Sequence, residues 1–334
     1  MNAKRNIIPV FVPHLGCPNN CVFCNQRKIS GSSTPANADL VKKTILEGIE
    51  KIPESSNIQL AFYGGSFTAI PVEEQNELMD AALPFLRDGT LKSLRLSTRP
   101  DAIDAKTLIR LKEYGVSTIE LGAQSMCDEV LDASGRGHTA LQTEKAARLI
   151  KQFGFELILQ MMTGLPEDTK AQAIETAKRI ILLYPDGVRI YPTVIIENTP
   201  LCDLWREGSY KEHTVEEAVE CCAAILPLFQ EAGIPVIRLG LNPTEELSHG
   251  AALGGAYHPA FGELVASRLL LEKARELLKD SVHGKNVTLN VNKSDVSAMI
   301  GQKKSNITAL SEEFSLKSIK VVQADLKKGS ITLS

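Results

Sequence analysis

Three cysteines lie within eight residues near the amino end of the chain, in the run Cys17-Pro18-Asn19-Asn20-Cys21-Val22-Phe23-Cys24. The C-x-x-x-C-x-x-C spacing gathers three thiols on one tight loop, although the chain has only seven cysteines in 334 residues. Three thiolates can hold three corners of a cubane iron–sulfur cluster, whereas a closed cluster uses four cysteines. The fourth iron would then lack a protein ligand and would be open to a substrate.

A zinc site is the main alternative for this loop, because His14 lies three residues before Cys17. Three thiolates and one imidazole form a normal ligand set for zinc. Inert, buried cysteines are disfavoured, since packing alone rarely groups thiols on a loop. An odd number of cysteines and the lack of a secretory leader also argue against a disulfide framework. An iron–sulfur cluster is therefore the favoured interpretation of this loop, and a zinc site stays open as the alternative.

The composition is that of an ordinary globular protein, with 43% apolar and 23% charged residues. The length allows one large domain and one small domain. A net charge of −3 gives no nucleic-acid signal for the chain as a whole. The apolar run Ile7–Val12 is interrupted by Pro9 and is too short for a signal peptide or a membrane span. We therefore expect a cytoplasmic protein without membrane partners.

Apolar strand patterns alternate with helical patterns along most of the chain. The expected strands are residues 7–12, 58–63, 94–97, 118–121, 155–162 and 188–191, with 236–239 as a further candidate. The expected helices are residues 39–52 (with Asp39 as N-cap), 73–86, 104–114, 140–153, 170–183, 215–232 and 261–278. This alternation predicts an α/β fold, a partial (β/α)6 TIM-like barrel whose chemistry lies on the loops after the strands.

Residues suited to ligand binding follow the second, third and fourth expected strands. Gly64 and Gly65 allow the backbone to approach a ligand closely. Thr98 and Arg99 stand at a strand end, where the guanidinium can meet a carboxylate or phosphate. Gln124 lies at the next strand end.

The cysteine spacing resembles the signature of the radical S-adenosylmethionine (radical SAM) enzymes. The resemblance implies a 4Fe–4S cluster on Cys17, Cys21 and Cys24, with S-adenosylmethionine bound at the open iron. Phe23 matches an aromatic position that lies near the adenine. Gly64, Gly65 and Ser66 match the glycine motif that holds the methionyl amino group, although Ser66 replaces an acidic residue. The remaining implied cofactor contacts are Thr98, Arg99 and Gln124.

Longer segments resemble the radical SAM domain of the Elongator catalytic subunit, in the same order and over about residues 5–270. The matching runs are Phe62-Tyr63-Gly64-Gly65-Ser66-Phe67-Thr68, Thr98-Arg99-Pro100-Asp101, Glu120-Leu121-Gly122-Ala123-Gln124-Ser125, Arg136-Gly137-His138 and Ile190-Tyr191-Pro192-Thr193. The Elongator subunit continues into an acetyltransferase domain that has no counterpart in these 334 residues, so no acetyl-CoA reaction is implied. Its cysteines are also more widely spaced.

The composition changes at residue 281, and we expect residues 1–280 and 281–334 to form separate domains. The tail has eight lysines against four acidic residues. Two helical stretches separated by a Gly-led turn, between strand patterns, resemble a KH domain, in which a G-x-x-G loop clamps the nucleic-acid backbone. The implied RNA contacts are Gly301, Lys303, Lys304 and Asn306. Lys304 stands in place of the second glycine, which makes any binding more electrostatic.

Taken together, the residues and the resemblances predict a radical SAM enzyme that modifies RNA, with tRNA favoured. Reductive cleavage of S-adenosylmethionine to a 5′-deoxyadenosyl radical would begin the chemistry, with a flavodoxin or ferredoxin as the electron donor. One alternative is a radical SAM enzyme that acts on a small molecule or a protein. Another is a non-catalytic RNA-binding scaffold that keeps an iron–sulfur cluster for stability. No catalytic residue is assigned from the sequence.

Overall fold

The computed structural model describes residues 5–12, 17, 21–26, 36–53, 57–241, 250–279 and 286–334. These residues group into two compact units. The first unit comprises Met1–Thr214 and Pro227–Tyr257, and the second comprises Val215–Leu226 and His258–Ser334. Each unit has its own sheet.

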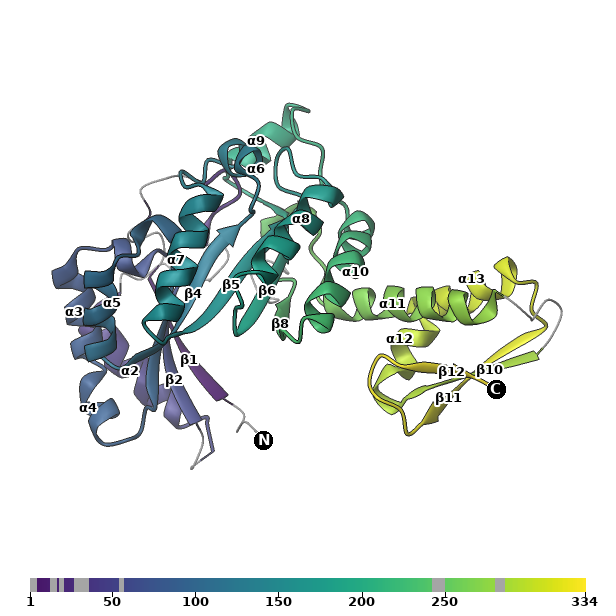
Figure 1. Cartoon of the computed structure of the whole chain (residues 1–334), viewed down its shortest axis with the longest axis horizontal. Coiled ribbons are helices and arrows are strands. Elements are labelled where there is room, and N and C mark those ends of the chain that lie inside the picture. Colours follow the sequence, from purple (N-terminus) through teal and green to yellow (C-terminus); the bar gives the residue numbers. More distant parts are fainter. Residues whose placement is uncertain are drawn as a thin grey trace. The chain divides into compact units, whose positions relative to one another are not determined.

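The first unit is built on a seven-stranded sheet in which all neighbouring strands are parallel (Figure 1). The strands, in spatial order, are β1 (Arg5–Phe11), β2 (Asn57–Tyr63), β3 (Ser93–Thr98), β4 (Val116–Gln124), β5 (Glu156–Thr163), β6 (Gly187–Pro192) and β8 (Val236–Leu239). The partial barrel is thus confirmed, and the seventh candidate strand belongs to the sheet. Strands β1 and β8 are its two edges.

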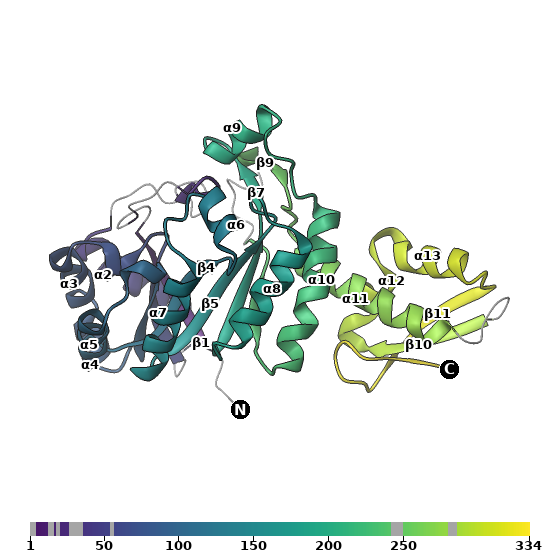
Figure 2. The ribbon, with the colours of Figure 1, turned by 45° about the horizontal axis from the view of Figure 1, so that its top comes forward.

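Helices connect these strands and cover one face of the sheet (Figure 2). They are α2 (Ala38–Ile49), α3 (Val72–Asp80), α4 (Leu83–Arg87), α5 (Ala105–Glu113), α6 (Asp128–Ala133), α7 (Ala140–Gln152) and α8 (Lys170–Ile181). Helix α9 (Pro200–Arg206) comes later in the chain, and α10 (Val215–Glu231) is divided between the two units. No helix within the described ranges combines the length and the apolar character needed to cross a membrane.

Two details of the expected helices are wrong. Asn37, not Asp39, caps α2, because its side chain accepts a hydrogen bond of 2.8 Å from the Leu40 amide. The helix expected over residues 73–86 is divided into α3 and α4. Pro84 explains the break, since its ring would collide with the carbonyl of the preceding turn and it has no amide to donate.

Two stretches that lie outside the expected strands and helices, residues 192–213 and 250–259, contain regular structure. Strand β7 (Val194–Ile196) pairs with β9 (Ala252–Gly255) in an antiparallel two-stranded sheet. The short apolar run of β7 is fully buried, and helix α9 follows it directly. These strands are too short to show a periodic pattern in the sequence, and they form by pairing with a distant segment of the chain.

The second unit has a three-stranded sheet with β10 (Asn286–Asn292) in the middle. β11 (Ser318–Ala324) lies parallel to β10, and β12 (Ile331–Leu333) antiparallel. Its helices are α11 (Phe261–Leu278), α12 (Val296–Ile300) and α13 (Ser305–Glu313). The boundary differs from the expected residue 280, because apolar residues of α11 share a core with the tail. That core includes Leu270, Ala274, Leu278, Leu289, Met299 and Leu310.

Leu289 is fully buried in this core, so Leu289→Ala should destabilise the second unit by about 2–5 kcal/mol through lost apolar contacts and a residual cavity. Hydrogen–deuterium exchange of the full chain should show faster exchange in β10 and β11, with little change in the first unit. Val322→Ala, at a β11 position that is 42% exposed, is the control. Equal effects of the two substitutions would contradict this core assignment.

Candidate cofactor site

A cavity of about 530 Å³ opens among the residues at the carboxyl ends of the parallel strands. All three clustered cysteines line it, as do most of the cofactor contacts implied by the resemblance. The lining includes Cys17, Cys21, Phe23, Cys24, Gly64, Gly65, Thr98, Arg99, Gln124 and Arg136. Residues from separate parts of the chain therefore meet at one edge of the sheet, as expected for a parallel α/β fold.

The cysteine loop is attached to two segments that follow distant strands. The Val22 amide donates to the Ser134 carbonyl at 3.1 Å, at the end of α6. The Leu201 amide, in α9, donates to the Val22 carbonyl at 2.8 Å. Cys21 and Phe23 are buried in an apolar cluster with Leu201 and other side chains. Both backbone groups of Val22 are thus paired, and the thiol positions depend on α6 and α9.

The thiols lie in a buried environment that also contains guanidinium groups. Arg136 Nη1 lies 3.4 Å from Cys21 Sγ. Burial raises the pKa of the Cys17 thiol, and it raises the pKa of Cys24 to about 12, while Arg99 and Arg136 act in the opposite direction at Cys17. The cation of a bound metal is what converts such thiols to thiolate ligands.

The three clustered cysteines have the donor chemistry of a multinuclear iron–sulfur cluster. A cubane cluster bonds each thiolate to a separate iron, so its ligands need to surround a volume and not a point. The three cysteines do line one cavity. His14, the fourth ligand of the zinc alternative, lies outside the described residues.

Arg99 has a positive charge at the cavity wall that its neighbours satisfy only partly. Its Nε lies 2.9 Å from Asp101 Oδ1, and its Nη2 donates to Asp101 and to the Arg136 carbonyl. Its Nη1 is buried and has no hydrogen-bond partner among the described residues. A buried guanidinium N–H without a partner favours an anionic ligand such as a carboxylate.

Gln124 has an unusual backbone conformation at the edge of the cavity. It is buried, and its φ of 65° is unusual for a residue other than glycine. The register between β4 and β5 shifts between Gly122 and Gln124, which marks a bulge at the cavity edge. Gln160 Nε2 donates to Gln124 Oε1 at 3.2 Å. A Cβ at Gly122 would lie 2.9 Å from Gln124 Nε2, so glycine makes room for this side chain.

Ser66 differs from the other implied cofactor contacts, because its side chain does not line the cavity. It is fully buried, and its Oγ accepts a hydrogen bond of 3.1 Å from the Arg99 amide. Its backbone amide instead hydrogen-bonds the Cys17 thiol. The geometry therefore assigns the Ser66 side chain to holding the Arg99 segment.

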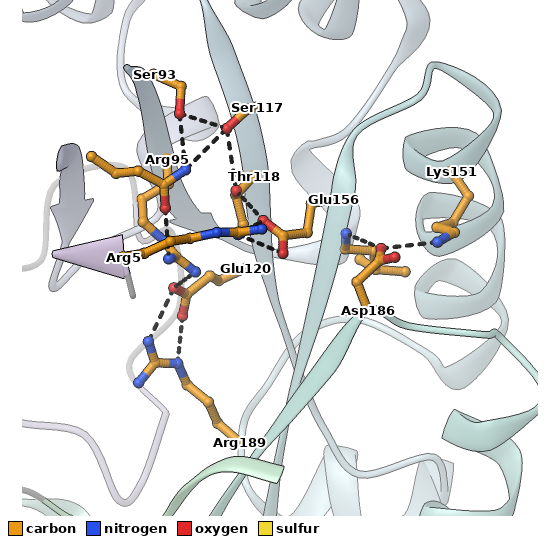
Figure 3. A network of polar contacts seen from close by, with 12 residues as sticks. Arg5, Ser93, Arg95, Ser117, Thr118, Glu120, Lys151, Glu156, Asp186 and Arg189 are labelled. Atoms are coloured by element: carbon orange, nitrogen blue, oxygen red, sulfur yellow. Dashed lines mark hydrogen bonds and ion pairs between the residues drawn. The ribbon is translucent and has the colours of Figure 1, made fainter. Parts of the chain in front are cut away.

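Several polar residues that line the cavity had no role predicted from the sequence. They are Gln26, Tyr63, Ser97, Glu120, Arg136, Gln160, Arg189 and Tyr191. Figure 3 shows Glu120 between the guanidinium groups of Arg95 and Arg189. The alternation of side chains along a strand could have indicated that Glu120 lines the cavity, because Glu120, Gly122 and Gln124 share one face of β4.

The tail loop expected to contact RNA has two exposed lysines in left-handed conformation. Lys303 has a φ of 51° and Lys304 a φ of 64°, and Lys304 stands where the G-x-x-G pattern has its second glycine. Asn306 is buried, and its Nδ2 donates to the carbonyls of Ser267 and Ala298, both at 3.1 Å. These bonds hold its side-chain amide inside the unit, where it supports the loop.

Two family models match the chain. Residues 11–180, just over half of the chain, match the model of the radical SAM superfamily. Residues 185–270 match the radical SAM C-terminal domain.

Among solved structures, the archaeal Elp3 of Methanocaldococcus infernus superposes with a TM-score of 0.62 at 24% identity, over 82% of this chain and 63% of that one. The radical SAM enzyme coproporphyrinogen III oxidase of Escherichia coli gives 0.50 at 18% identity, over 69% and 53%. These two likenesses concern the fold.

Curated relatives are similar over about half of this chain. The tRNA uridine(34) acetyltransferase of Methanocaldococcus jannaschii is 31% identical over 54% of the chain, and human Elongator complex protein 3 is 28% identical over 55%. The chain spans only 37% of the length of each. An uncharacterised protein of M. jannaschii is 31% identical over 61% of the chain and 66% of its own length. The fold, the gathered cysteines and the family match lead to one conclusion: the chain belongs to the radical SAM superfamily, whose cofactors are a 4Fe–4S cluster and S-adenosylmethionine.

Proposed function

We propose that the protein is a radical SAM enzyme that modifies RNA, with tRNA as the favoured substrate. The observation that carries the enzymatic part is the shared cavity, which the three clustered cysteines and Arg99 all line. Cys17, Cys21 and Cys24 would hold the cluster. Together with a one-electron donor of the flavodoxin or ferredoxin type, the two cofactors supply a 5′-deoxyadenosyl radical that abstracts a hydrogen atom.

The chain's own residues would bind and orient the S-adenosylmethionine. The Nη1 of Arg99 suits the methionyl carboxylate, because a charge-assisted hydrogen bond in a buried site is strong and directional. The glycine pair Gly64 and Gly65 leaves backbone groups open to the amino group. Gln124, fixed by its bulge and by Gln160, has amide donors that suit the ribose or the carboxylate. Phe23 contributes an apolar surface for the adenine.

Two observations support RNA as the substrate. Curated relatives that match half of the chain are named as tRNA uridine(34) acetyltransferases and Elongator subunits. In the second unit, the turn after α12 exposes Lys303 and Lys304 in a backbone conformation that these residues rarely adopt. Strained turns of this kind persist mainly at binding sites. A cytoplasmic location fits this substrate and keeps the thiols reduced.

Replacing Cys21 by Ala should remove most of the bound iron and sulfide and abolish the formation of 5′-deoxyadenosine, because two thiolates do not retain the cluster. Iron, sulfide and zinc analysis of the anaerobically reconstituted protein checks the first effect, and chromatography of the cofactor products checks the second. Cys127→Ala is the matched control, since this thiol does not line the cavity. Zinc in place of iron, or undiminished deoxyadenosine in the Cys21 variant, would refute the enzymatic assignment.

Replacing both Lys303 and Lys304 by Asn should weaken RNA binding several-fold and lower the slope of log K against log salt by about 1–2, because two phosphate contacts are lost. Asparagine tolerates the left-handed backbone and so separates charge from folding. The control removes the same charge elsewhere in the unit, at exposed Lys327 and Lys328. Fluorescence anisotropy with labelled tRNA measures both. If the two double variants bind alike, this loop is not the RNA site.

Deletion of the gene should remove one modified nucleoside from total tRNA, measured by mass spectrometry of digested nucleosides. Complementation with the wild-type gene should restore it, whereas Cys21→Ala should not, because that variant has no radical chemistry. Lys303→Asn with Lys304→Asn should give a partial restoration. An unchanged nucleoside profile in the deletion strain would favour the small-molecule or protein substrate.

A further inference from the structure

The deep end of the cavity contains a charged group that the cofactors do not explain. Glu120 lies four residues before Gln124 on β4, and both line the cavity. At the rise of a β-strand, four residues correspond to about 13 Å. Glu120 and the side chains around it therefore form a floor well below the rim where the cysteines and Arg99 lie.

Two arginines flank the single carboxylate of this floor (Figure 3). Arg95 Nη2 lies 2.7 Å from Glu120 Oε1, and Arg189 Nε lies 2.7 Å from Glu120 Oε2. The side chains of Arg95 and Glu120 are 4% and 5% exposed, and that of Arg189 is 16% exposed. Arg95 Nε is buried without a partner among the described residues. The floor thus has one more positive charge than negative.

The phenols beside the floor do not neutralise this excess charge. Tyr63 donates a hydrogen bond of 2.5 Å to Glu120, and the Tyr191 hydroxyl accepts one of 3.3 Å from Arg189. Burial raises the pKa of both tyrosines, so both stay protonated and neutral. The other two arginines that line the cavity lie near its rim and have contacts of their own. Arg99 is paired with Asp101, and Arg136 donates to the sulfur of Cys21 and to the carbonyl of Gly122.

A buried positive charge without a counter-ion is unfavourable, because pairing must offset its loss of hydration. A bound anion would supply the missing charge. It is not the methionyl carboxylate of the cofactor, since a group held at Arg99 and the thiol loop stays near the rim. Glu120 also disfavours a dianion such as phosphate, because its own charge lies within the floor. A carboxylate has one charge and two acceptor oxygens, which suit Arg189 and the hydroxyl of Tyr191.

We propose that the cavity floor of Glu120, Arg189 and Tyr191 binds the carboxylate of a small second substrate. The carbon skeleton of such a molecule would extend from the floor toward the cofactor end, within reach of hydrogen abstraction. This inference rests on the proposed function only in placing a substrate in the cavity. The anion binding itself depends on neither the cluster nor cofactor cleavage.

The test is a ligand-observed NMR titration of the full, anaerobically purified chain without S-adenosylmethionine. Acetate is the probe, and acetamide is its neutral counterpart of nearly the same shape. Acetate should bind measurably and acetamide at least about tenfold more weakly, because the neutral amide gains no charge-assisted bond. Arg189→Gln should weaken acetate binding about tenfold or more. Arg5→Gln is the matched control, since Arg5 pairs with Glu156 and does not line the cavity.

Glu120→Gln separates a binding role from a structural one. If the floor binds anions, removing the carboxylate should tighten acetate binding several-fold, because the excess positive charge grows. If the network only holds the strands together, Glu120→Gln and Arg189→Gln should have the same effect on acetate affinity: either both leave it unchanged or both weaken it. Either result would overturn the proposal. Circular dichroism monitors folding. If either variant unfolds, Tyr191→Phe takes its place: weaker acetate binding by this variant supports the proposal, and unchanged binding overturns it. Equal binding of acetate and acetamide by the wild-type protein would also overturn the proposal.

Because the titration measures binding without S-adenosylmethionine or its cleavage, it separates two kinds of failure. If the wild-type protein binds acetate but forms no deoxyadenosine, the enzymatic assignment is contradicted, whereas the anion site at the cavity floor is supported. Normal deoxyadenosine formation without acetate binding would contradict only the floor.

Discussion

The common direction of the strands is the constraint on which the site depends. Because the seven strands of the sheet are parallel, their carboxyl ends and the loops that follow them lie along one edge. Cys17, Gly64 and Arg99 follow β1, β2 and β3, and Gln124 ends β4, and they line one cavity for this reason. A reversed strand would carry its loop to the opposite edge. The parallel topology therefore determines where these residues gather, whatever contacts their side chains then make.

Within that frame, the cysteine loop is positioned by segments that lie far from it in sequence. Both backbone hydrogen-bonding groups of Val22 are used, one by Ser134 after α6 and one by Leu201 in α9. A buried backbone group without a partner is costly, so these bonds keep the loop in place as well as covering it. Segments after β4 and β7 thus serve the thiols after β1, although none of them contains a clustered cysteine.

The polar interior distinguishes this barrel from one that is filled only for stability. Barrel interiors are usually packed with branched apolar side chains. Here Arg95, Glu120 and Arg189 lie at the middle of the sheet with two tyrosines beside them. Burying charges rarely adds stability compared with apolar packing. Such a network is better explained by a ligand, and it provides fixed dipoles and charges that need no rearrangement when that ligand binds.

The sequence by itself determined the alternation of strands and helices, the cysteine triplet and the glycine pair. These signals are local: each depends on spacing along the chain. The superfamily followed from them as a resemblance and was then shown by the match over residues 11–180. The strand ends carrying Arg99 and Gln124 were also predictable, because the apolar run of a buried strand stops there.

Only the tertiary structure decided which side chains face the cavity and which support it. Ser66 and Asn306 carry polar groups suited to binding, but their neighbours use those groups inside the protein. Conversely, Glu120 and Arg189 stand within strand patterns that suggested burial alone. The placement of β4 and β6 on either side of β5 brought them together on the floor of the cavity. The physical reason is that hydrogen bonding and burial depend on which strands become neighbours, and spacing along the chain does not specify the partner.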